Sequence, residues 1–171
     1  VYNSQNSANF GKIYISNAKA GTTAFGRATS DGIYMLNADG SDAGYATGGK
    51  NWVTAGDNSP FKSTIGPDGH LYVSDYSNDL VWEFNDDLSA ATQLSNASNK
   101  TTGQYVESIY VEGTQAAGNR RIYVVDSDYN DARRGLIRYD LGSAGAAASG
   151  DTSTQVIGPD YFGFYPRDVA R

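Results

Sequence analysis

A short apolar segment with a central tyrosine occurs three times in this sequence of 171 residues. Its copies are KIYISNA from Lys12, HLYVSDY from His70 and RIYVVDS from Arg121, and each is followed by a second apolar segment. The copies begin 58 and then 51 residues apart, and both intervals contain turn-rich insertions. Without the insertions the unit approaches the roughly 40 to 50 residues of a four-stranded propeller blade, so the spacing predicts a β-repeat.

The composition also favours strands. Thirteen Tyr, two Trp and six Phe provide bulky side chains that suit sheets, and 20 Gly with many Asn, Ser and Asp suit turns. No segment sustains the apolar period of about 3.6 residues that a helical repeat needs. We therefore expect an all-β chain that forms a single unit over residues 1–171.

Four strands can be assigned to a unit, named A to D from the centre outward. In the middle unit they are predicted at 61–65, 71–74, 80–84 and 91–94. In the third unit they are predicted at 106–111, 121–125, 136–139 and 154–157. The first unit has B, C and D near 12–16, 33–36 and 52–54, and YPRDVAR near the C-terminus matches a lone A strand. The strands therefore occur in the order B-C-D, A-D, A-D, A, where A-D stands for a complete set of four. The first blade would cover 1–57 together with 164–171, the second 58–102 and the third 103–163.

Residues 59–87, SPFKSTIGPDGHLYVSDYSNDLVWEFNDD, resemble one repeat of the NHL type and of related six-bladed propellers. They share with that group a Pro-Asp-Gly turn, an apolar-Tyr-Val-x-Asp strand and a following Asn. The match is weaker in the third unit, where GTQAAGNRR replaces the tight turn, and in the first, where Asn17 replaces the strand's Asp. The resemblance implies a β-propeller, usually six-bladed, and no single function, because propellers include lyases, lactonases and binding modules.

Three blades are fewer than the four to eight of ordinary propellers, so this chain is expected to form half of a six-bladed ring. Half a ring would expose two broad apolar blade faces. Two copies related by a two-fold axis would close six blades, with each C-terminal A strand joining the partner's first blade. The alternative is that the missing half belongs to a longer propeller of which this sequence is a part.

Charge and hydropathy restrict the partners. The net charge of -6 and the pI near 4.6 argue against nucleic-acid binding, which requires clustered Lys and Arg. No apolar run approaches the roughly 20 residues that span a bilayer. The low Lys content, with abundant Asn, Ser, Thr and Gly, favours an exported protein that is secreted, periplasmic or on the cell surface.

Few catalytic signals are present. His70 is the one histidine, and its place beside a Pro-Asp-Gly turn indicates a turn residue rather than a general base. The chain has no Cys and no Gly-x-Ser-x-Gly elbow. We therefore expect a non-enzymatic exported scaffold or binding module without a cofactor. The alternative is an enzyme that resembles the lactonase or lyase propellers, whose divalent metal lies in the central channel. Glu107 and Asp168 would contribute metal ligands, but the positive charge of Lys62 at the equivalent position argues against a metal site there.

The segment DSDYNDARRG contains alternating oxygen ligands of the kind that wrap calcium. It lacks the Gly and Glu of a helix-loop-helix calcium site, and Arg133 and Arg134 could instead neutralise its carboxylates. Calcium therefore competes with a salt-bridged loop. The metal candidates are Asp126, Asp128, Asn130 and Asp131.

A ligand site is expected at the mouth of the central channel. Lys62, Glu107 and Asp168 are predicted to share one register of the A strands, and loops on the same face add aromatic side chains. Such a loop face suits a carbohydrate, peptide or protein ligand. The alternative is that these charges pair across blades and line a hydrated tunnel. The candidate residues are Lys62, Glu107, Arg167, Asp168, Arg27, Tyr76, Tyr129 and Tyr161.

Overall fold

The computed structural model describes residues 9–17, 32–48, 51–52, 60–76, 80–94, 106–127, 135–146, 154–158 and 169, and leaves the side chains of 45–48, 51–52 and 155 undescribed. These residues form twelve strands in three sheets, with no helix among them. The first sheet contains β1 (Ile13–Asn17), β2 (Gly32–Leu36), β3 (Asp42–Gly48) and β4 (Asn51–Trp52). The second contains β5 (Pro60–Ile65), β6 (Leu71–Asp75), β7 (Leu80–Phe84) and β8 (Ala91–Gln93). The third contains β9 (Val106–Glu112), β10 (Arg120–Asp126), β11 (Gly135–Gly142) and β12 (Thr154–Ile157).

The strands follow chain order within each sheet, and neighbours are antiparallel except for the short parallel pair of β3 and β4. The all-β class and the strands of the second and third sheets are thus confirmed. The D strand of the first unit, predicted near 52–54, was misplaced: the strand that pairs with β2 is β3, which begins at Asp42, and β4 lies beyond β3. The NADG turn reverses the chain at once: Gly40 has a φ of +83°, a conformation that glycine adopts without steric cost. Within the described residues, none forms a helix suited to crossing a membrane.

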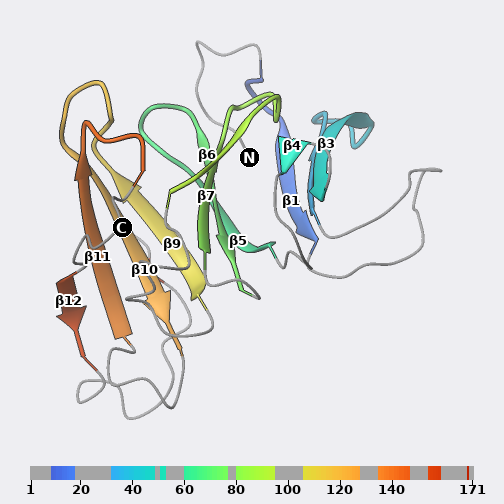
Figure 1. The fold of residues 1–171 in the computed structure, drawn as a ribbon. Coiled ribbons are helices and arrows are strands. Elements are labelled where there is room, and N and C mark those ends of the chain that lie inside the picture. Colours follow the sequence, from blue (N-terminus) through green and yellow to red (C-terminus); the bar gives the residue numbers. More distant parts are fainter. Residues whose placement is uncertain are drawn as a thin grey trace.

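The second sheet lies between the other two and is buried on both faces (Figure 1). All five residues of β6 and all five of β7 are buried. Successive side chains on a strand point to opposite faces, so Val73 and Phe84 pack toward Ile33 of the first sheet, while Tyr72 and Val81 pack toward the third. Two cores result, one on each side of the second sheet.

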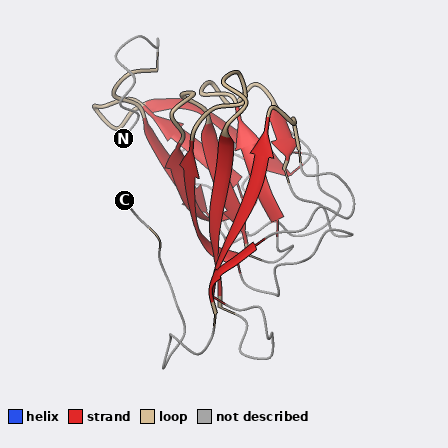
Figure 2. Cartoon of the chain, turned by 90° about the vertical axis from the view of Figure 1, so that its left-hand side faces the viewer, coloured by secondary structure: helices blue, strands red, loops and turns tan. Residues whose placement is uncertain are grey.

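The first strand described in each sheet lies on the same side of the stack. β1 is beside β5, and β5 is beside β9 (Figure 1). The described turns of the three sheets gather at one end of the strands (Figure 2). Near the C-terminus, the Val169 amide donates to Ser108 Oγ of β9 at 3.2 Å. Ser108 pairs with Val125 on the face of the third sheet that points away from the second, so the chain returns to that outer face.

Gly135 is required where β11 meets β12. Its φ is +132°, and a Cβ at this position would lie 2.0 Å from the Ile157 carbonyl oxygen. Gly135→Ala is therefore expected to lower the free energy of unfolding by about 2 kcal/mol through backbone strain, with displacement of β12 in addition. Urea denaturation measures this loss. In Gly40→Ala, where φ is +83° and no atom lies within 4 Å, only the conformational cost of about 1 kcal/mol is expected. Equal losses in the two variants would contradict the tight β11–β12 contact.

Candidate functional site

Only part of the predicted channel mouth can be placed. Lys62, Tyr76 and Glu107 are described, and so is Asp126 of the calcium segment. The other candidates lie outside the described residues: Arg27, Tyr129, Tyr161, Arg167, Asp168, Asp128, Asn130 and Asp131.

Lys62 and Glu107 do not share a register. Ser63 pairs with Val73 and Ile109 pairs with Val124, and the two valines are equivalent positions of β6 and β10. Counting back from these pairs, Lys62 corresponds to Ser108. The predicted alignment was therefore off by one residue: Pro60 and Val106 pair with the equivalent residues Asp75 and Asp126, so Phe61 corresponds to Glu107. Accordingly, Lys62 is exposed whereas Glu107 is only 2% exposed.

Glu107 and Asp126 are buried carboxylates at the start of β9 and the end of β10. Ser127 Oγ donates to Glu107 Oε1 at 2.8 Å. Asp126 is fully buried and pairs with Val106 in the sheet. Asp126 therefore belongs to a strand end, and calcium binding by the segment that follows stays a prediction.

An aromatic end is formed by Phe61, Lys62 and Tyr76 of the second sheet. The rings of Phe61 and Tyr76 are 5.5 Å apart at their centroids and tilted by 30°. Phe61 is 49% exposed, and Lys62 beside it is also exposed. Its backbone is anchored, because the Lys62 amide donates to Ser74 Oγ at 3.1 Å. An exposed ring and an exposed lysine thus occupy neighbouring positions on this strand.

A polar cluster that the sequence reasoning missed lies at the other end of the second sheet, where it meets the third. The cluster consists of Asp68, His70, Tyr72, Glu83 and Arg120. His70 Nδ1 lies 2.5 Å from Glu83 Oε1, and Arg120 Nη1 donates to Glu83 Oε2 at 2.8 Å. The Tyr72 hydroxyl donates to Asp68 Oδ2 at 2.6 Å. Hydrogen bonds and ion pairs therefore link two sheets at this point.

Arg120 is the buried anchor of the polar cluster. Its side chain has no exposed surface, and its Nη2 donates to the carbonyls of Ala144 at 2.6 Å and Gly145 at 3.1 Å. Burial acts to lower the pKa of Arg120, but the hydrogen bond to Tyr72 and the charge of Glu83 outweigh it and raise the pKa above its usual value. Arg120 therefore remains a cation that Glu83 neutralises.

Tyr72 is held as a neutral donor. Burial, followed by its hydrogen bond to Asp68, raises the pKa of Tyr72 far above that of an exposed tyrosine. Tyr72 and Glu83 are direct partners across β6 and β7, which brings their side chains to one face. The hydroxyl therefore donates to the carboxylates beside it and does not act as a base.

An open cavity of about 490 Å³ adjoins the polar cluster. Turn residues of the third sheet form its other wall. Its lining residues are Asp68, His70, Glu83, Thr114, Gln115, Ala116 and Ser143. Carboxylate, imidazole, hydroxyl and amide groups thus face a space large enough for several waters or a small polar ligand.

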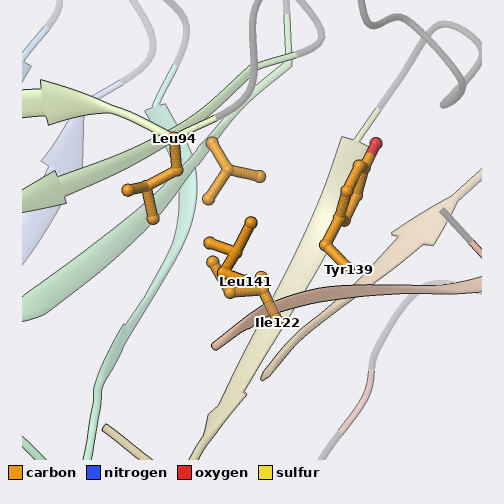
Figure 3. A pocket seen from close by; sticks show the side chains of 5 residues that line it. Leu94, Ile122, Tyr139 and Leu141 are labelled. Carbon is orange, nitrogen blue, oxygen red and sulfur yellow. The ribbon is translucent and has the colours of Figure 1, made fainter. Parts of the chain in front are cut away.

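A second cavity lies within the core between the second and third sheets (Figure 3). Its volume is about 10 Å³, and it has an apolar lining. It is a packing gap rather than a site, because its apolar lining gives a water no polar partners. The lining residues are Val81, Leu94, Ile122, Tyr139 and Leu141.

No protein-family model matches this sequence, and no curated protein matches it. Among solved structures, the chain is similar to a crystal structure of a protein of unknown function from Bacteroides caccae. The identity is 16% and the TM-score is 0.48, over 80% of this chain and 45% of the other. This chain therefore spans less than half of that protein, and the similarity assigns no activity.

Proposed function

We propose that this chain is a non-enzymatic scaffold or binding module built from propeller-type blades of the NHL-like group. Its ligand binds at the aromatic end, on the loop face over the central channel. The composition supports export to the cell surface, periplasm or medium. The observation that carries the binding function is the exposed ring of Phe61, which packs on the partly buried Tyr76, next to the exposed Lys62.

The packing of the sheets supports the blade interpretation. In a propeller, each four-stranded sheet packs face to face on its neighbours, and the innermost strands adjoin around an axis. The second sheet here is buried on both faces, β5 lies between β1 and β9, and all three sheets follow chain order. These are the relations expected of three consecutive blades.

The aromatic end suits a carbohydrate. Aromatic rings are large apolar surfaces that protein cores normally cover, and Phe61 leaves about half of its surface in solvent. The apolar face of a sugar ring can stack on such a surface while its hydroxyls bond to polar neighbours. Lys62 provides a donor at the rim, since the ammonium has three N–H groups and no acceptor.

The register of the repeat supports a module over an enzyme. In the metal-dependent alternative, carboxylates would gather in the channel. The equivalent of Glu107 in the second sheet is Phe61, as the register above requires, so the repeat does not supply a second carboxylate at that position.

Phe61→Ala is expected to abolish carbohydrate binding while leaving the fold intact. The change removes the ring that packs on Tyr76, and about half of the Phe61 surface is already in solvent. We expect the wild-type chain to bind at least one sugar class on a printed glycan array, and the variant to lose at least ~10-fold in affinity, equivalent to ~1.4 kcal/mol.

Val156→Ala serves as the matched control, because Val156 is also an exposed apolar strand residue, 44% accessible, but lies in β12 of the third sheet. It should bind the array as the wild type does. Absence of glycan binding by the wild type, or unchanged binding by Phe61→Ala, would contradict the proposal. If the wild type bound an immobilised peptide instead of a glycan, the aromatic end would be a peptide-binding site.

We further propose that a second copy of the chain covers the outer faces of the stack. On the first sheet, Ile15 pairs with Tyr34 on the face opposite Ile33, and Ile15 is 43% exposed. On the third sheet, the outer face carries Tyr123 and receives Val169. Head-to-tail packing of these two faces in two copies would complete six blades. The competing arrangement is completion by the other half of a longer propeller.

A further inference from the structure

We propose that Asp68, His70 and Glu83 form a zinc-binding site that opens into the cavity between the second and third sheets. This site lies at the opposite end of the second sheet from the aromatic end. It does not depend on the proposed carbohydrate site, so either proposal can fail alone.

The donor atoms are already close together. Asp68, His70 and Glu83 each offer one ligand atom, and the three atoms lie within 4.8 Å of one another. One imidazole nitrogen with two carboxylate oxygens is a ligand set that zinc accepts, whereas calcium prefers oxygen ligands alone. The chemistry of the donors therefore favours zinc.

The oxygens on the far side of both carboxylates are held by other residues. Tyr72 donates to Asp68 Oδ2 at 2.6 Å, and the buried Arg120 donates to Glu83 Oε2 at 2.8 Å. The remaining oxygens are directed to His70. Asp68 Oδ1 accepts from the His70 backbone amide at 3.1 Å, and Glu83 Oε1 lies 2.5 Å from His70 Nδ1. Metal-binding carboxylates are commonly fixed by such outer contacts.

The turn itself does not require the histidine. Asp39 and Asp87 make the same turn, and their carboxylates accept from the amides of Ser41 at 2.9 Å and Ser89 at 2.8 Å. Both of those turns have serine at the position of His70. These two turns follow β2 and β7 rather than β5, but they show that the turn geometry is satisfied without an imidazole at the position of His70.

The cavity provides the fourth coordination position. Three protein ligands leave a tetrahedral zinc one place for water or another small ligand. The polar cluster borders an open space of about 490 Å³, and Thr114 and Ser143 of the third sheet lie on its far wall. A zinc ion there would connect the β5–β6 turn, through Asp68 and His70, to Glu83 of β7, and so stabilise this end of the second sheet.

Isothermal titration of the whole chain with zinc chloride, after treatment with a chelator, tests the site. We expect one zinc per chain, an increase in melting temperature on zinc addition, and no heat with calcium chloride at the same concentration. His70→Ala should weaken zinc binding at least ~100-fold, and Tyr72→Phe, which removes only an outer contact, about 10-fold. Asp87→Asn changes a turn of the same kind between β7 and β8, which has no histidine, and should bind zinc as the wild type does.

Three results would overturn the proposal. They are no zinc heat at millimolar metal, equal zinc affinity in His70→Ala, and equal binding of calcium and zinc. Circular dichroism of each variant confirms that a lost signal reflects lost ligands, and His70→Gln, which preserves size and polarity at this half-exposed position, replaces His70→Ala if the latter fails to fold.

Discussion

Arg120→Met is expected to lower the free energy of unfolding by about 3–5 kcal/mol, measured by urea denaturation. Arg120 has no exposed surface, and it connects Glu83 of the second sheet to two carbonyls of the third. Methionine retains the apolar stem but removes every donor. The loss is large because Glu83, which is only 8% exposed, is left as a buried charge without its arginine.

Two comparisons identify this mechanism. Arg121→Met removes the neighbouring arginine, whose ion pair with Asp140 is about half exposed, and should cost at most about 1 kcal/mol. Adding Glu83→Gln to Arg120→Met should recover part of the loss, because the uncompensated charge is then removed. Similar costs for the two arginine variants, or no recovery in the double variant, would show that Arg120 does not anchor the sheets.

Phe84→Ala is expected to cost about 3–5 kcal/mol through loss of apolar burial and formation of a cavity. Phe84 is fully buried and belongs to the core between the first and second sheets. It lies in β7, opposite Leu71 and Ala91. The urea midpoint should fall strongly while the slope of the transition stays unchanged, because the same surface is exposed on unfolding.

Phe61→Ala is the matched control, because it makes the same residue change at a position that is only partly buried. Phe61 is 49% exposed, so Phe61→Ala should lower the unfolding free energy by only about 1 kcal/mol. If Phe84→Ala proved as mild as Phe61→Ala, the core between the first and second sheets would not exist as described.

The strands could be predicted from the sequence because their signals are local. Apolar segments bounded by turn residues locate β5 to β7 and β9 to β12 within three residues. The first unit was harder, because NADG is followed by β3 without an apolar run to mark it: DAGYATG has few large apolar side chains. The D strand was therefore predicted around Trp52, about ten residues after the true start of β3.

The sites were less predictable, because they depend on contacts between sheets. Tyr76 and Lys62 were expected at one loop face, and the structure adds Phe61, which had been assigned only to a strand. His70 was expected to be a turn residue, and its side chain is indeed 42% exposed. His70 is linked to Arg120 through Glu83. Glu83 and Arg120 are 37 residues apart in the sequence and meet only because two sheets stack, which no local pattern encodes.

The solution mass of the chain, measured by light scattering at micromolar concentration, tests most directly the claim that two copies complete one ring. The chain mass is 18.2 kDa, and we predict a species of twice that mass. The dimer should weaken in Ile15→Lys, which places a charge on the exposed apolar face of the first sheet. A species with the mass of a single chain would contradict closure by self-association.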